Sequence, residues 1–80
     1  MNDQDIVRHI SELADEEREL ERAHAGQPPT EDEVARLRAV EVALDQCWDL
    51  LRQRRARRHA GLDPDEAATR PEGMVEGYEQ

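Results

Sequence analysis

The sequence predicts an all-α protein built on an antiparallel, coiled-coil-like two-helix hairpin. Strand-forming residues are sparse among the 80 residues, with no Phe, one Tyr and one Trp, while the helix formers Ala, Glu, Arg and Leu dominate. Two long stretches repeat apolar residues at steps of three, four and seven, which is typical of amphipathic helices. The break between them, Gly26-Gln27-Pro28-Pro29, is so short that the helices are expected to be antiparallel neighbours.

The first helix is expected over residues 3–25, within a hairpin domain that covers residues 1–61. Asn2 or Asp3 can cap its start, where the helix dipole also favours acidic side chains. Its apolar seam consists of Ile6, Ile10, Leu13 and Leu20. Glu17 occupies the heptad position between the last two seam residues, so the seam has one polar interruption.

The second helix is expected over residues 31–60, after a turn over residues 26–30. Thr30 and Glu33 match the T-x-x-E capping box directly after the proline pair, and this is the strongest local signal in the chain. The heptad track of this helix consists of Leu37, Val40, Leu44, Cys47 and Leu51. Gly61 provides the stop.

Counting outward from a turn centred near Pro28 brings the two seams into register. The facing pairs are Ile6 with Leu51, Ile10 with Cys47 and Trp48, Leu13 with Leu44, and Leu20 with Leu37. Glu17 then lies near Val40, where Arg36 could reach it. The two seams were identified independently, so their matching register supports the hairpin.

Residues 62–80 are expected to form a short helix and an acidic tail. Asp63-Pro64 is a typical helix start, which predicts a helix over about residues 64–69 that ends before Pro71. The tail beyond it is expected to be partly mobile, unless its apolar side chains hold it against the hairpin. Those side chains are Met74, Val75 and Tyr78.

Composition and charge exclude several classes of function. The chain has 20 acidic residues and 11 basic ones, all of them Arg, and its net charge of −9 argues against nucleic acid and anionic membranes as partners. No apolar run is long enough to cross a bilayer, and the acidic N-terminus lacks the apolar segment of a signal peptide. A single Cys forms no intrachain disulfide. We therefore expect a cytoplasmic protein.

A hairpin of this composition is expected to need a partner surface. Two helices leave each seam half exposed, and the simplest partner is a second copy, which gives a four-helix bundle with two-fold symmetry. Trp48 and Leu50 are expected at the outer edge of the seam, where a partner would bury them. The alternative is that the C-terminal tail closes the open side.

The C-terminal end of the second helix carries a basic cluster. Its residues are Arg52, Arg54, Arg55, Arg57 and Arg58. Cations complement the dipole at a helix C-terminus, and they can pair with Asp3, Asp5 and the acidic tail. The alternative is a binding site for phosphates or for an acidic protein patch. The cluster contains no interleaved aromatic residue and lies in a negative field, which favours the structural interpretation.

Two further constellations are weaker candidates. His9 is expected near Cys47, and a dimer could bring two such pairs around zinc, although the spacing matches no zinc motif. The acids at the hairpin tip, Glu31, Asp32 and Glu33, could serve a regulator of RNA polymerase, but acids in the first turn of a capped helix need no such role. No nucleophile–base pair stands out. We expect no catalytic activity and no cofactor.

Three sequence segments resemble a family of short actinobacterial proteins that is known only as a domain of unknown function. They are Met1-Asn2-Asp3-Gln4-Asp5-Ile6, the run from Leu44 to Ala56 with its Cys-Trp-Asp-Leu-Leu-Arg-Gln-Arg-Arg core, and Gly61-Leu62-Asp63-Pro64-Asp65. The resemblance implies an actinobacterial source but no activity.

We expect a non-catalytic, self-associating interaction protein. The alternatives are a transcription- or ribosome-associated regulator that uses the basic cluster or the acidic tip, and a metal-binding bundle.

Overall fold

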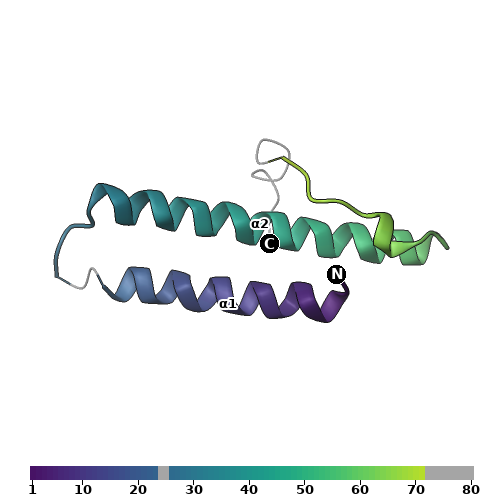
Figure 1. Ribbon diagram of the computed structural model, residues 1–80, viewed down its shortest axis with the longest axis horizontal. Helices are drawn as coiled ribbons and strands as arrows, with labels where there is room; N and C mark the ends of the chain where they lie inside the picture. Colours follow the sequence, from purple (N-terminus) through teal and green to yellow (C-terminus); the bar gives the residue numbers. More distant parts are fainter. Residues whose placement is uncertain (24–25, 72–80) are drawn as a thin grey trace.

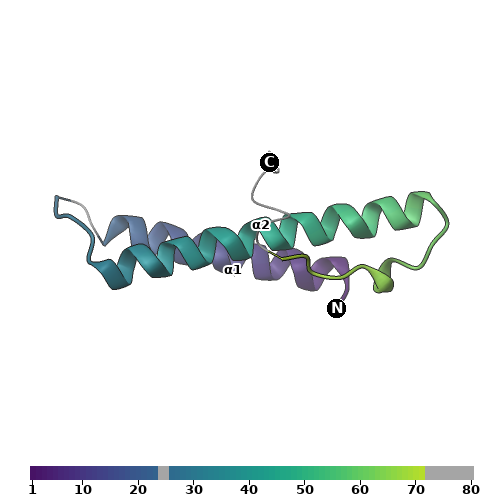
Figure 2. The same cartoon turned by 90° about the horizontal axis from the view of Figure 1, so that it is seen from above.

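The chain is all-helical in the computed structural model, which describes residues 1–23 and 26–71. Helix α1 spans Asp3–Arg22, helix α2 spans Glu31–His59, and a single 3-10 turn, η1, spans Pro64–Glu66. The two long helices lie side by side and antiparallel, and together they form a molecule about 51 Å long (Figure 1). The view from above shows that α2 extends well past the start of α1 (Figure 2).

Both long helices begin at a complete capping box. The Asn2 side chain accepts a hydrogen bond from the Asp5 backbone N–H at 2.8 Å, and the Asp5 carboxylate accepts one from the Asn2 N–H at 3.1 Å. Thr30 and Glu33 make the same reciprocal pair at the start of α2, as the sequence predicts. Each box satisfies backbone donors that would otherwise lack partners.

The helices end slightly earlier than the sequence predicts. Helix α1 ends at Arg22, and residues 24–25, at the end of its expected range, lie outside the described residues. Helix α2 ends at His59, and Gly61 follows with a positive φ of 74°. The Leu62 N–H donates to the Arg57 carbonyl at 2.8 Å, which turns the chain back toward α2. In the described part of the chain, neither helix is long and apolar enough to span a membrane.

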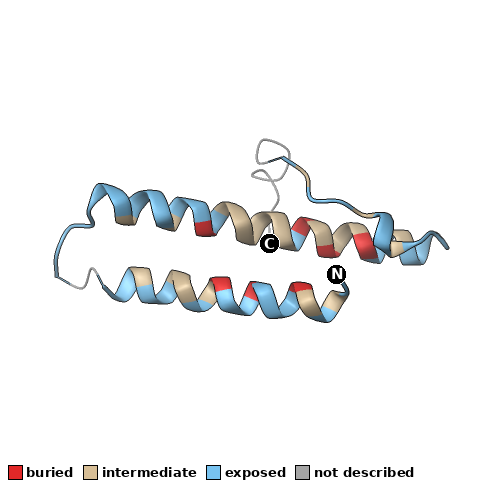
Figure 3. Ribbon diagram, viewed as in Figure 1, coloured by how far each residue is buried: buried red, intermediate tan, exposed pale blue. Residues whose placement is uncertain are grey.

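The core lies along the interface of α1 and α2. Ile6, Ile10 and Leu51 form one buried cluster, in agreement with the expected facing of Ile6 and Leu51, and Leu44, Cys47 and Leu50 pack against it. Apart from Asp49, which binds Arg70, the buried residues line the facing sides of the two helices (Figure 3). Farther along, Arg36 pairs with Glu16 at 2.5 Å rather than with Glu17. Glu17 instead lines a hollow beside Trp48.

Residues 62–71, which we call the strap, run back along α2 (Figure 1). Only one 3-10 turn forms where the sequence predicts a helix over about residues 64–69, because Ala67 is already extended at φ −66° and ψ 143°. Side chains of α2 hold the strap in this form. Gln53 donates to the Ala68 carbonyl at 2.7 Å, and Gln46 donates to the Arg70 carbonyl at 3.3 Å. The tail with Met74, Val75 and Tyr78 lies outside the described residues.

Candidate interaction surfaces

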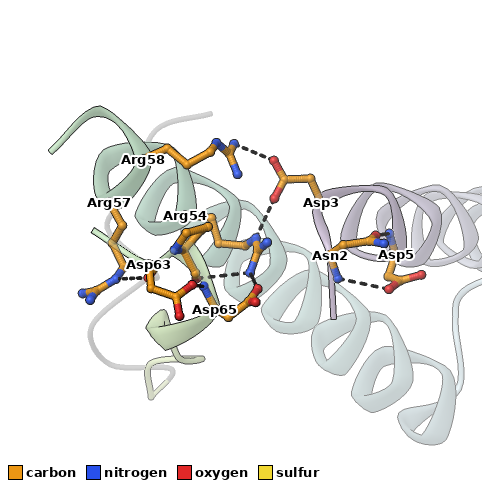
Figure 4. Close-up of polar contacts among 9 residues, drawn as sticks. Asn2, Asp3, Asp5, Arg54, Arg57, Arg58, Asp63 and Asp65 are labelled. Atoms are coloured by element: carbon orange, nitrogen blue, oxygen red, sulfur yellow. Dashed lines mark hydrogen bonds and ion pairs between the residues drawn. The ribbon is translucent and has the colours of Figure 1, made fainter. Parts of the chain in front are cut away.

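Arg54 is the centre of the basic cluster and is almost completely buried, with 6% of its surface exposed. Its Nε donates to the Asp3 carboxylate at 2.5 Å, which joins α2 to the first residue of α1. Its Nη1 donates to the Pro64 carbonyl at 3.1 Å and to the Asp65 carboxylate at 3.0 Å (Figure 4). One guanidinium therefore holds both helices and the strap together.

Two neighbouring arginines extend this network. Arg57 donates to the Asp63 carbonyl at 2.6 Å and pairs with Glu66 at 2.7 Å, while Arg58 pairs with Asp3 at 2.6 Å. Hydrogen bonds from Arg58 and Arg54 lower the pKa of Asp3 from its ordinary 3.8 to about 2. The same contacts from Asp3 and then Asp65 raise the pKa of Arg54.

The structure therefore places most of the basic cluster in internal contacts. Asp3 pairs with the cluster as expected, but Asp5 does not, because its carboxylate caps α1 and pairs with Arg8 at 3.5 Å. Arg55 is the exception within the cluster, since it is exposed and makes no ion pair or hydrogen bond in the described part of the chain. A surface for binding phosphates would need several such free guanidinium groups close together.

A buried ion pair that the sequence reasoning missed fixes the far end of the strap. Asp49 is fully buried, and Arg70 binds it in a bidentate manner, with Nε–Oδ2 and Nη2–Oδ1 distances of 2.9 and 2.6 Å. Gln53 donates a further hydrogen bond to Asp49 at 2.9 Å. One feature of the sequence could have indicated this ion pair. Gln46, Asp49 and Gln53 form a polar face on one side of α2, away from its seam.

The hairpin has two different sides. On the strap side a groove of about 220 Å³ is lined by Leu50 together with Ile6, Cys47 and Thr69, among others. On the other side a hollow of about 300 Å³ lies beside Trp48, and no strap residue lines it. The sequence reasoning placed Trp48 and Leu50 together at the outer edge. They lie on different sides because two residues along an α-helix are separated by about 200°.

His9 and Cys47 line the same groove, so the structure brings these two weak metal candidates to one place. The described residues contain no group of three or more His, Cys, Asp or Glu side chains that could hold a metal ion. Burial also raises the pKa of the Cys47 thiol. A raised pKa disfavours the thiolate, which is the form that binds metals and attacks electrophiles.

The sequence model of the family described as "Protein of unknown function (DUF2630)" matches residues 2–80, which is nearly the whole chain. The chain belongs to this family. It is also 49% identical over 78 residues to "Uncharacterized protein Rv0898c" of Mycobacterium tuberculosis and to "Uncharacterized protein Mb0922c" of Mycobacterium bovis, with 95% of this chain and 88% of each relative covered. The expected resemblance to an actinobacterial family is confirmed. No solved structure matches the chain.

In this DUF2630 chain the acidic tip of the hairpin is accounted for by helix capping. Glu33 closes the capping box with Thr30, and Glu31 and Asp32 are exposed first-turn acids that complement the dipole of α2. The contacts of the tip therefore give no further evidence for a binding site there. On the side of α2 that carries Trp48, contacts within the described chain do not account for the exposed indole.

Proposed function

We propose that the chain is a non-catalytic protein-interaction module that self-associates through the side of the hairpin that carries Trp48. The observation that carries this proposal is the contrast between the two sides of α2. Residues of the strap cover one side through Asp49, Gln53 and Arg54. The other side keeps Trp48 37% exposed beside a hollow of about 300 Å³.

A second copy is the partner that fits this surface most simply. The described residues bury only five apolar side chains well, namely Ile6, Ile10, Leu13, Val40 and Leu51, which is a small core for a hairpin about 51 Å long. Pairing two hairpins on their open sides would give a dimeric four-helix bundle and remove the indole of Trp48 from water. Exposed tryptophan is a common anchor of protein interfaces.

The chemistry of the described residues supports a role in binding rather than catalysis. The groove that contains His9 and Cys47 brings a base and a nucleophile to one place, and burial raises the pKa of the thiol there. A catalytic cysteine needs the opposite shift. We place this activity in the cytoplasm, because the chain carries a single cysteine and a strongly acidic surface that an anionic membrane would repel.

Sedimentation equilibrium of the full chain with Trp48→Glu tests the proposal. A buried carboxylate at the interface is unfavourable, so the variant is expected to sediment as a monomer while the wild type sediments as a dimer at micromolar concentration. Ala39→Glu is a matched control, because Ala39 is an exposed residue of α2 on a different face of the helix. A folded wild-type chain that remains a strict monomer would overturn the proposal.

A further inference from the structure

We infer that α2 packs antiparallel against α2 of a second copy, with the two-fold axis at Trp48, so that Glu41 of each copy pairs with the partner's Arg55. This inference rests on the proposed self-association and adds the contact surface and its register. It uses three α2 residues that the network of the strap does not contact in the described structure.

Glu41, Trp48 and Arg55 form a single stripe along α2. They are spaced seven residues apart, so they lie almost directly above one another on the helix. All three are exposed, and the stripe lies on the side of α2 away from the strap, where Glu41 and Trp48 share a hollow with Glu17 of α1. Val34, one heptad before Glu41, extends the stripe and is 52% exposed.

The order of side chains along this stripe is self-complementary only when the two helices run in opposite directions. Reversal about Trp48 brings the residue one heptad before it opposite the residue one heptad after it. Glu41 then meets the partner's Arg55, and the same pair occurs again on the other side of the axis. A parallel pair in the same register would instead oppose like charges at both positions, which is unfavourable.

The two charged residues of the stripe are available for these contacts. Neither Glu41 nor Arg55 makes an ion pair or a hydrogen bond within residues 1–23 and 26–71, whereas Arg36, Arg54 and Arg58 are all paired. The hollow beside Trp48 is lined by Glu17, Glu41 and Asp45, so acidic side chains surround the position that receives the partner's Arg55.

Apolar residues complete the pattern at the centre and at the ends. The two indoles of Trp48 meet at the axis, where an offset or edge-to-face pair of rings is favourable. Val34 lies two heptads before Trp48 and is 52% exposed. In the antiparallel pair Val34 lies beyond the Glu41–Arg55 pair, toward the C-terminal end of the partner's α2.

Charge reversal tests the register. The full chain is compared as wild type, Glu41→Arg, Arg55→Glu and the double variant, by sedimentation and by concentration-dependent fluorescence of the single tryptophan. Each single variant is expected to raise the dimer Kd at least about tenfold, because it creates two like-charge contacts. The double variant restores both pairs with reversed polarity and is expected to return to within about threefold of wild type.

Arg8→Glu and Glu12→Arg are the matched controls, because they change the net charge by the same amounts. Both side chains are 68% exposed on α1, away from the stripe. These variants are expected to leave the dimer Kd close to that of wild type. A dimer that tolerates both single reversals of the stripe overturns the register but not the self-association, whereas a monomeric wild type overturns both.

Cross-linking tests the direction of the helices independently. In a Cys47→Ser background, an oxidised mixture of Glu41→Cys and Arg55→Cys chains is expected to form a disulfide-linked heterodimer. Each variant alone is expected not to cross-link, because the two equivalent positions lie about 21 Å from each other along an antiparallel pair. Efficient cross-linking of Glu41→Cys with itself would contradict the antiparallel arrangement.

Discussion

The two sides of α2 differ in how far the rest of the chain covers their side chains. On the strap side, polar side chains of α2 bind the carbonyls and charged groups of residues 62–71, and Asp49 and Arg54 become buried in the process. On the other side, Trp48 stays partly exposed in line with Glu41 and Arg55, which make no ion pair or hydrogen bond in the described part of the chain. The chain covers one side of its hairpin itself and leaves Trp48 partly exposed on the other, and this difference is the basis of the proposed self-association.

The largest expected effect is on the strap side, where Arg70→Ala removes the bidentate ion pair of a fully buried carboxylate. A buried charge that loses such an ion pair is costly, so we expect the free energy of unfolding to fall by about 3 kcal/mol. Denaturant titration followed by circular dichroism, at one fixed protein concentration, measures the change. Arg70→Lys is the matched control and should recover part of the loss, because it keeps the charge but not the bidentate geometry. A change below about 0.5 kcal/mol for Arg70→Ala, the usual size of a surface substitution, would mean that the pair does not hold the strap.

An intermediate effect is expected at Asp3, and it should depend on pH. Arg58 and Arg54 lower the pKa of Asp3 from 3.8 to about 2, so the folded state is favoured above pH 3.8 and this advantage is lost as pH falls toward 2. Asp3→Asn should therefore unfold at lower denaturant concentration than wild type at neutral pH, and the two midpoints should converge between pH 4 and 2. A difference that stays constant over this range would contradict the role given to Asp3.

The smallest effects separate two neighbouring arginines. Arg57→Ala removes a partly exposed pair with Glu66 and a hydrogen bond to the strap, for which we expect a loss of about 0.5–1 kcal/mol. Arg55→Ala removes no contact within the described chain, so the stability of the monomer should change by less than about 0.5 kcal/mol. Thermal melts of both variants at a concentration below the dimer Kd make this comparison. Equal losses of stability in the two variants would show that the two sides of α2 do not contribute differently to the stability of the monomer.

The sequence was sufficient to predict the two helices and their register, because these depend on local signals. Thr30 and Glu33 fix one helix start, the Gly-Gln-Pro-Pro turn sets the direction, and heptad spacing aligns Ile6 with Leu51. The strap was not predictable in this way. Asp63-Pro64 is a good helix start, but Gln53 and Arg54 bind strap carbonyls from a distant part of the chain, and such contacts leave no local pattern.

The candidate site was harder to predict for the same reason. The cluster of arginines near the end of α2 was visible in the sequence. Which of their guanidinium groups form ion pairs, however, depends on the path of the chain after Gly61. Arg54 and Arg55 are adjacent in sequence, yet one is buried in three contacts and the other is exposed. A helix rotates by about 100° between neighbours, and only the folded strap decides which of the two it meets.

The position of Asp3 also bears on how the protein should be labelled for such experiments. Met1 lines the groove on the strap side, and two residues later Asp3 already holds Arg54 and Arg58. An affinity tag joined directly before Met1 would crowd this junction and weaken the fold. The loss of stability would then be mistaken for a loss of binding. Pro71, by contrast, is exposed and lies beyond the strap contacts of the described residues, so a label introduced at this position would leave the junction clear.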